Sequence, residues 1–160
     1  MSGTDHLPTG APPTGGGLTL RVVTPEGALH DGPVETVVVP SHDGETAFLK
    51  GHAAFVGLLG IGELRFHTVG GEPSHFFLGG GVVQVVHDVV SVLAESVVPA
   101  TALDPAKARA ELEAAIHLPT ASDEQIAVKD KALLTARARL RIAERAHGAA
   151  PAGAPAAAAH

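Results

Sequence analysis

The chain has 160 residues, a formal net charge of −6 and no cysteine. This length indicates one domain, or one domain with an appendage, and the lack of cysteine excludes disulfide bonds and thiolate chemistry. The longest apolar stretches run for about ten residues, whereas a membrane-spanning helix needs roughly 20. Residues 1–10 lack the basic and apolar regions of a signal peptide. We therefore expect neither a bilayer span nor a secretory signal.

Charge is distributed unevenly along the chain. Residues 1–100 contain three bases and ten acids, whereas residues 101–160 contain eight bases and seven acids. An acidic body followed by a more basic segment predicts two modules. Nucleic-acid binding depends on Lys and Arg contacts to phosphates, so the acidic body argues against a nucleic-acid partner.

After a leader at 1–17, rich in Pro, Gly and Thr and expected to be disordered, short apolar runs alternate with turns. The run Leu18–Thr24 places Leu18, Leu20 and Val22 on one face, as a half-buried strand does. Similar runs recur at 34–39, 45–49, 55–59, 63–69, 74–78, 82–86 and 89–94, with turns expected at 30–33 and 60–62 among others. Short strands without helical periodicity predict a mainly β domain over 18–100, an antiparallel β-sandwich or barrel.

The character of the chain changes after a hinge at 97–103. Asp104 and Pro105 are typical of a helix start, since Asp accepts from the first-turn amides and Pro needs no donor there. Ser122 opens a second helix, which continues to about Ala146. We therefore expect an α-helical hairpin over 101–147, followed by a low-complexity tail at 148–160. Its apolar stripe is thin and padded with Ala, so we expect it to dock on another surface and to be able to undock.

The sequence contains no catalytic constellation. No two of its ten His lie within five residues of each other, and there is no His-x-His of the kind that metal-binding sandwiches use. We expect His52 to be structural and to bond a neighbouring strand. Gly79–Gly81 lacks the Gly-Lys-Ser/Thr ending of a phosphate loop, so close backbone packing or a bulge is the better interpretation. No Ser has a G-x-S-x-G setting.

Six bases lie between Lys129 and Arg145. On a helix, Arg137, Arg141 and Arg145 share one face at i, i+4 spacing, where like charges cost a few tenths of a kcal/mol per pair. Two interpretations remain open: a solvated basic face, or a surface for an acidic partner.

Two motifs resemble the epsilon subunit of the bacterial F-type ATP synthase. The first is a Gly turn, an apolar strand and a Gly-His segment, here Asp43-Gly44-Glu45, Phe48 and Lys50-Gly51-His52-Ala53-Ala54-Phe55. The second is Gly79-Gly80-Gly81 with its Val-rich hairpin ending in Leu93-Ala94-Glu95. Lys50 and Ala54 replace the two prolines of the first motif, and we expect a looser loop there. The resemblance covers about 18–147 and implies a sandwich of about ten strands before the hairpin.

The resemblance implies a non-catalytic rotor subunit of the central stalk of a proton-translocating synthase, peripheral on the cytoplasmic face of the cell membrane. The sandwich would pack on the gamma subunit. The turn formed by Ser41, His42, Asp43, Gly44 and Glu45 would touch the ring of c subunits. The hairpin would extend into the alpha/beta hexamer and block ATP hydrolysis. Arg137, Arg141 and Arg145 would then meet an acidic segment of the beta subunit, while Gly51, His52 and Gly79, Gly80, Gly81 would be structural.

Some members of this family bind regulatory ATP at the start of the first helix. The corresponding residues here are Leu103, Asp104, Lys107 and Ala108. Lys107 replaces an Arg, and the two are not equivalent at a phosphate; we therefore expect no cofactor. Two alternatives remain: a cupin-like sandwich enzyme with a bound metal, and a free-standing ATP-sensing module.

Overall fold

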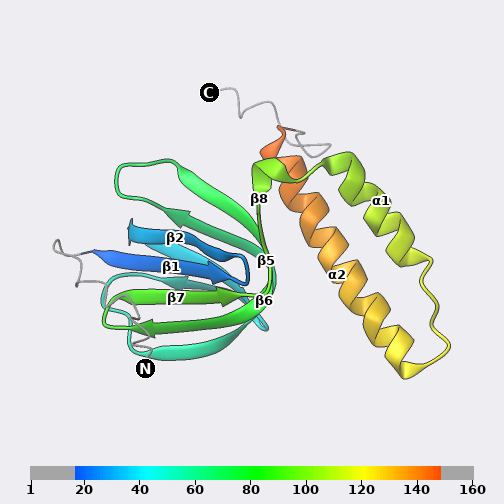
Figure 1. Cartoon of the computed structure of the whole chain (residues 1–160), viewed down its shortest axis with the longest axis horizontal. Helices are drawn as coiled ribbons and strands as arrows, with labels where there is room; N and C mark the ends of the chain where they lie inside the picture. Colours follow the sequence, from blue (N-terminus) through cyan, green and yellow to red (C-terminus); the bar gives the residue numbers. More distant parts are fainter. Residues whose placement is uncertain (1–16, 149–160) are drawn as a thin grey trace, which may run out of the picture.

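The computed structural model describes residues 17–148 (Figure 1). The predicted leader and tail lie outside the described residues, apart from residue 17 and Gly148. The elements are β1 (Leu18–Thr24), β2 (Gly27–Val34), β3 (Thr36–Ser41), β4 (Gly44–Phe48), β5 (Phe55–His67), β6 (Pro73–Val86), β7 (Val89–Ala94), β8 (Val97–Pro99), a 3₁₀ turn η1 (Ala100–Ala102), α1 (Pro105–Ile116) and α2 (Asp123–Ala146). None of the described helices is long and apolar enough to cross a bilayer.

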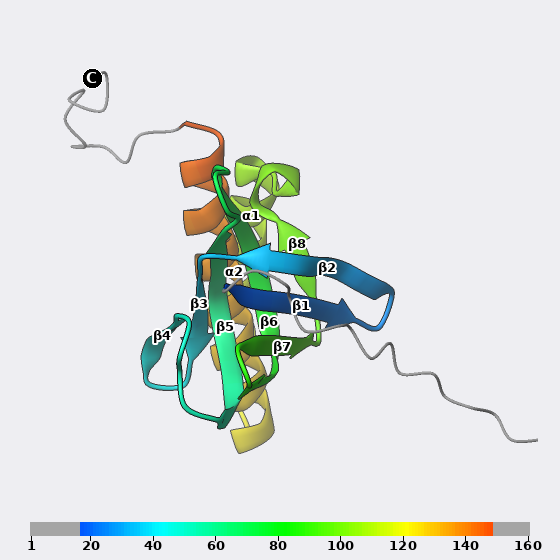
Figure 2. The same cartoon turned by 90° about the vertical axis from the view of Figure 1, so that its left-hand side faces the viewer.

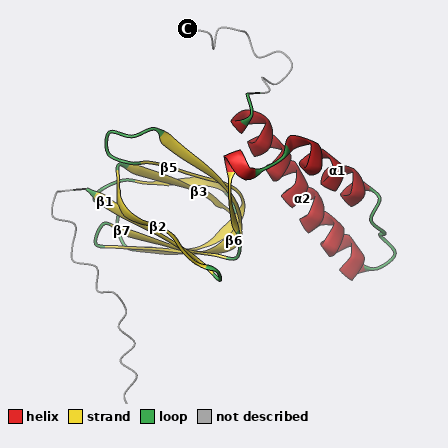
Figure 3. Cartoon of the chain, turned by 45° about the horizontal axis from the view of Figure 1, so that its top comes forward, coloured by secondary structure: helices red, strands yellow, loops and turns green. Residues whose placement is uncertain are grey.

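The eight strands form one strongly curved sheet that closes into a sandwich. Their order is β2-β1-β7-β6-β5-β3-β4, and β8 pairs with β6. Every pairing is antiparallel except that of β1 with β7, which is parallel. Figure 3 shows β3 and β5 in one layer and β1, β2 and β7 in the other, and Figure 2 shows β1 and β2 running across the long strands β5 and β6. The predicted β-sandwich followed by two helices is confirmed.

Strands β5 and β6 pass from one layer to the other. They contain 13 and 14 residues and each spans two of the predicted runs. Pairing continues through the bend, from Leu59 opposite Gly81 to Ile61 opposite Gly79. The turn expected at 60–62 is therefore wrong, because the glycines bend the strand without ending it. Counting each half separately turns eight strands into ten segments, the number that the family resemblance implied.

The glycine triplet makes this bend possible. Gly81 has a φ of +141°, and a Cβ there would collide with the backbone carbonyl of Leu93. Only glycine accommodates both the conformation and the close approach. The expectation of close backbone packing at Gly79–Gly81 is confirmed.

Strand β2 was missed by the sequence analysis, which placed a turn at 30–33. Gly27–Val34 pairs with β1 from Thr24 opposite Gly27 to Leu18 opposite Val34, with a bulge between Val22 and Val23. It lies at one end of the strand order, where Pro33 is tolerated because an edge strand has one unpaired side. Its mixed residues give no alternation, so the neighbouring strand determines its conformation.

Alternating strand residues fill the sandwich core. The predicted inward set Leu18, Leu20 and Val22 is at most 1% exposed. Sixteen buried apolar residues make up this core: Leu18, Leu20, Val22, Val34, Val37, Val39, Phe48, Leu59, Leu64, Phe66, Leu78, Val83, Val85, Val90, Val92 and Ala94.

Both helices begin where the capping residues predict. The Asp104 carboxylate accepts from the Ala106 amide at 2.9 Å, and the Ser122 hydroxyl accepts from the Gln125 amide at 3.2 Å. Gly148 follows the end of α2 with a φ of +68°. Helix α2 lies against β5, β6 and η1, and α1 packs on the side of α2 away from the sandwich (Figure 1).

Candidate functional site

A small apolar cluster holds the hairpin on the sandwich. We call it the docking cluster, and it consists of Phe77, Ala100, Leu103, Ala138, Ile142 and Ala143. Phe77 lies on β6 but belongs to this cluster and not to the sandwich core, so its ring faces α2. The Arg139 guanidinium lies 4.7 Å from the centre of the Phe77 ring, a cation–π contact. The cluster contains one aromatic ring, two branched aliphatic side chains and three Ala.

A buried carboxylate lies beside the docking cluster. Glu63 stands opposite Phe77 in the β5–β6 register and is 5% exposed. Its Oε1 atom lies 3.3 Å from His75 Nδ1 and 3.5 Å from an Arg65 nitrogen, and its Oε2 atom accepts from Arg145 at 3.4 Å. Alternation along β5 marks Glu63 as a solvent-facing residue, and no local signal shows that α2 covers it. Sequence reasoning therefore missed it.

The turn predicted to touch the c ring is a rigid hairpin between β3 and β4. Gly44 adopts a φ of +128°, and the Ser41 hydroxyl donates to the Gly44 carbonyl at 3.2 Å. Glu45 receives two hydrogen bonds from Arg65, at 2.8 and 2.9 Å. His42 and Asp43 are exposed at the tip of the turn.

The Arg65 pair perturbs the acidity of Glu45. Hydrogen bonds from Arg65 hold the pKa of the Glu45 carboxyl below its ordinary value, and burial opposes this only in part. The charge of Arg65, and those of Arg141 and Arg145 on α2, act in the same direction. Glu45 therefore lies within the electrostatic field of the docked helix.

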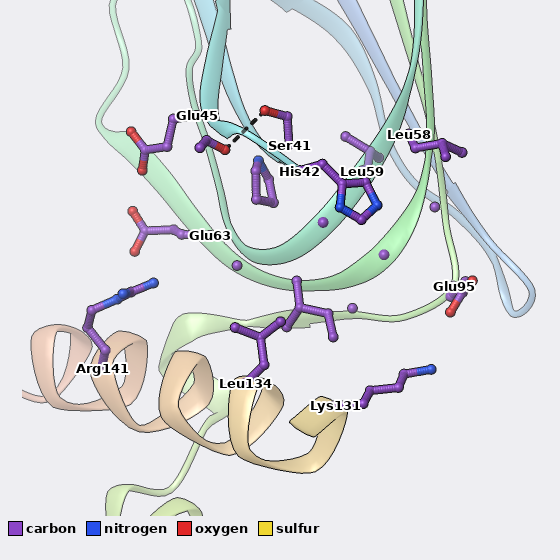
Figure 4. Close-up of a pocket in the computed structure, with 18 of the residues that line it drawn as sticks. Ser41, His42, Glu45, Leu58, Leu59, Glu63, Glu95, Lys131, Leu134 and Arg141 are labelled. Atoms are coloured by element: carbon purple, nitrogen blue, oxygen red, sulfur yellow. Dashed lines mark hydrogen bonds between the residues drawn. The ribbon is translucent and has the colours of Figure 1, made fainter. Parts of the chain in front are cut away.

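The β3–β4 turn and α2 border one groove of about 840 Å³ (Figure 4). Its sandwich wall carries Glu45, Glu63 and Glu95, and its helix wall carries Lys131, Arg141 and Arg145. Of the three arginines predicted to meet an acidic partner, Arg141 and Arg145 thus face acids of the same chain. Arg137 is exposed and does not line this groove.

The Gly-His segment connects two loops at one end of the sandwich. Gly51 has a φ of +83°, and its amide donates to Asp88 Oδ1 at 2.7 Å. The His52 ring packs edge-on against Phe48, with 5.0 Å between centroids. Its Nδ1 atom lies 2.8 Å from the carbonyl of Ala53, the next residue, so the expected bond to a neighbouring strand is wrong. Because the 50–54 segment loops out between β4 and β5, that carbonyl is nearer than any strand.

The residues of the predicted regulatory nucleotide site line a concavity of about 210 Å³. Leu103 and Ala108 are buried, and the Asp104 carboxylate is engaged as the cap of α1. The Leu103 carbonyl lies 2.6 Å from His147 Nε2. Ligand pockets usually hold about 300–1,000 Å³, so this concavity is small for a nucleotide.

An apolar row crosses the outer face of four strands. In the register, Leu58 on β5 pairs with Val82 on β6, Val82 with Leu93 on β7, and Leu93 with Val23 on β1. Directly paired residues point to the same face of a sheet. Leu58 is 64% exposed, Leu93 57% and Val23 39%, so the row is open to solvent. Contiguous exposed apolar surface of this kind marks interaction sites.

Among residues 17–148 no three His, Asp or Glu side chains gather in a way that could hold a metal ion. The cupin-like hypothesis thus has no support from the geometry of these residues.

Comparison with known proteins agrees with this geometry. Residues 17–100 match the family model described as ATP synthase, Delta/Epsilon chain, beta-sandwich domain. The ATP synthase epsilon chain of Rhodopirellula baltica is 41% identical over 120 residues, which cover 75% of this chain and 93% of that protein. The epsilon chain of Acidithiobacillus ferridurans is 36% identical over 130 residues, covering 80% and 92%. A chain in the cryo-EM structure of the Euglena gracilis mitochondrial ATP synthase shares the fold, with a TM-score of 0.71, 22% identity, and coverage of 77% of this chain and 79% of that one.

The curved sandwich with its helical hairpin, and the family match over residues 17–100, place the chain among the accessory subunits of the ATP synthase. The chain belongs to the delta/epsilon family of the ATP synthase, and its relatives over most of its length are epsilon chains. The expected role, a non-catalytic central-stalk subunit of the F-type synthase, is confirmed, and the alternative enzyme and free-standing sensor are not supported.

Proposed function

We propose that this chain seats its sandwich on the gamma subunit, touches the ring of c subunits through the β3–β4 turn, and restrains ATP hydrolysis through its hairpin. In this arrangement it lies peripherally on the cytoplasmic face of the membrane and turns with the rotor. The observation that carries the proposal is that the fold has two parts with different properties. A rigid sandwich presents one open apolar row, and a lightly held hairpin carries the basic residues.

The apolar row is the surface that we assign to gamma. It runs across β1, β5, β6 and β7, with Leu58 at the groove beside α2, and leaves Leu58 and Leu93 more than half exposed. Covering these side chains would remove apolar surface from water, and each Å² so buried stabilises a complex by ~25 cal/mol. A helix or sheet of gamma with an apolar face would supply that cover.

Co-purification with gamma tests this assignment. Leu58→Glu or Leu93→Glu should abolish capture of gamma, because a carboxylate would be buried without a partner. Val69→Glu is the matched control, since Val69 is 66% exposed on the β5–β6 turn and lies outside the row. Unchanged capture by the two row variants, with normal folding, would remove the gamma assignment.

The β3–β4 turn suits a contact with a moving ring because internal bonds make it stiff. The two hydrogen bonds from the Arg65 guanidinium hold the Glu45 side chain in place, and the positive φ of Gly44 allows the chain to turn tightly. In the assembled synthase, Asp43→Cys should cross-link to a cysteine placed on the loops of the c ring. Glu72→Cys, on the β5–β6 turn, should not. Equal cross-linking from both positions would contradict the assignment.

The hairpin is the part that we assign to inhibition. Arg137, Arg141 and Arg145 would meet an acidic segment of the beta subunit once α2 leaves the sandwich. Deletion of residues 101–160 should raise ATP hydrolysis by the assembled complex without preventing assembly. Replacement of the three arginines by Gln should reproduce much of this increase. Unchanged hydrolysis in both would remove the inhibitory role and leave the rotor role intact.

Regulation by ATP is not part of the proposal. The small concavity at Leu103–Ala108, and Lys107 in place of Arg, both argue against nucleotide binding. Calorimetric titration of the full chain with Mg-ATP should give no heat of binding. A micromolar dissociation constant would instead make the hairpin a nucleotide-regulated element.

A further inference from the structure

The hairpin is held by so little apolar surface that its polar contacts can decide whether it stays docked. Half of the docking cluster is Ala, its other members are Phe77, Leu103 and Ile142, and the partly buried Ile61 and Val98 pack against it. Few of these side chains bury much area, and hydrophobic stabilisation scales with buried area. A change of one or two kcal/mol would then shift the population of the docked state by a factor of about 5–30.

Glu63 is the polar group best placed to exert that control. A buried carboxylate is tolerated only when it is paired and hydrogen-bonded. Arg65 and His75, both on the sandwich, approach its Oε1 atom. Arg145 alone comes from the hairpin, and it donates to the other oxygen, Oε2. The carboxylate would therefore keep two cationic or hydrogen-bonding neighbours, and regain water, when α2 leaves.

The contact lies at the end of α2 that is nearest the hinge. Arg145 is in the last turn, and His147, two residues further on, contacts the Leu103 carbonyl. The docking cluster takes Ala138, Ile142 and Ala143 from the second half of α2, the half that also carries Arg145. Loss of the Glu63–Arg145 pair would thus weaken the part of the helix that carries the docking contacts.

We propose that Glu63 is the internal receptor for Arg145 and sets the fraction of chains whose hairpin is docked. Arg145 can then make only one of two contacts at a time. It either pairs with Glu63, which holds the hairpin on the sandwich, or meets an acidic partner. An acidic partner must therefore compete with Glu63 for Arg145, because Arg145 is already paired in the docked state. This competition rests on the proposed inhibitory function, whereas the receptor role of Glu63 concerns the isolated chain alone.

The absence of cysteine gives a direct test. Ala143→Cys places a single thiol at a position that is 0% exposed under the docked helix, and its reaction rate with a maleimide reports undocking. Ala94→Cys, in the sandwich core and 5% exposed, reports opening of the sandwich instead. Ala138→Cys, 4% exposed, is a second hairpin reporter if Ala143→Cys itself disturbs docking.

Glu63→Gln should raise labelling of the thiol at position 143 about fivefold or more, and leave labelling at position 94 unchanged. Arg145→Gln should have the same effect, and the double variant should add nothing, because both substitutions remove one interaction. Glu113→Gln is the matched control, since Glu113 is exposed and pairs with His117 at the end of its own helix. Equal or slower labelling in Glu63→Gln would overturn the proposal, as would full additivity in the double variant.

A second measurement separates docking from competition. Poly-glutamate, used as an acidic probe, should bind the full-length Glu63→Gln variant more tightly than the parent chain, with the gain lost on Arg145→Gln. Faster labelling without tighter binding would overturn the competition and keep the receptor role. Neither measurement requires the synthase, so their failure leaves the gamma and c-ring assignments standing. Conversely, absence of inhibition in the assembled complex would not affect the labelling result.

Discussion

The sandwich and the hairpin are stabilised to very different degrees by apolar burial. Sixteen buried apolar residues form the sandwich core, including Phe48 and Phe66 and only one Ala. Six form the docking cluster, and three of these are Ala. Because stabilisation scales with the apolar area removed from water, the sandwich can persist after the hairpin has left. The difference predicts that the sandwich is a stable scaffold and that the hairpin can be released from it.

The largest effect is expected from a cavity in the scaffold. Leu64→Ala removes a side chain that is 0% exposed in the sandwich core and should cost about 2–5 kcal/mol. Urea unfolding followed by β-sheet circular dichroism measures this loss. A cost below about 1 kcal/mol would show that the sandwich core is not the main source of stability.

The matching change in the docking cluster should act locally. Ile142→Ala should weaken docking by about 2 kcal/mol, at the low end for such a change because the Ala-rich surroundings can relax. Hydrogen exchange should accelerate in α1 and α2 and remain slow in the core strands. Equal acceleration in both regions would mean that hairpin and sandwich unfold as one unit, and the hairpin would then not be a separately releasable arm.

A polar link tests whether the loops of the scaffold are as firmly held as its core. Asp88 has a φ of +61° and accepts the Gly51 amide. Asp88→Ala loses the acceptor and strains the left-handed backbone, at a cost of about 1–2 kcal/mol. Asp88→Asn is the control, since Asn tolerates this conformation and retains an acceptor oxygen. The midpoint of thermal unfolding should therefore be lower for Asp88→Ala than for Asp88→Asn. Identical midpoints would contradict a stabilising role of the Gly51–Asp88 hydrogen bond.

The smallest effect concerns acid. The folded-state pKa of Glu45 is lowered from its ordinary value of 4.5, chiefly by Arg65. Its contribution to stability is therefore present above that value and is lost as the pH falls through the lower folded-state pKa. Urea midpoints measured from about pH 6 to about pH 3 should fall slightly more for the parent than for Glu45→Gln. Parallel curves would show that the Arg65 pair contributes nothing, as exposed pairs often do.

Local patterns in the sequence were sufficient for much of the fold. Alternation identified the inward face of β1, and Asp104 and Ser122 identified both helix starts, because capping depends on residues within one turn. Strand β2 was missed because its residues do not alternate and only pairing with β1 makes it extended. The turn at 60–62 was wrong because glycine permits a bend as well as a reversal, and local sequence does not distinguish them.

The candidate surfaces divide in the same way. Arg137, Arg141 and Arg145 share a helix face by spacing alone, and that spacing follows from 3.6 residues per turn. Their partners do not follow from it. Glu63 lies 82 positions from Arg145 along the chain and comes within 3.4 Å only when α2 packs on β5. The apolar row was also hidden, because four strands must come into register before Val23, Leu58, Val82 and Leu93 form one surface.

By itself the sequence determined the class of the protein, the order of sandwich and hairpin, and the basic face of α2, because periodicity, capping and motif spacing are local properties. Tertiary structure alone decided what that basic face touches. Burial of Glu63 under α2, and the pairing of Arg145 with it, arise from the packing of distant segments. Whether the basic face is free or held is therefore a property of the docked fold and not of the helix.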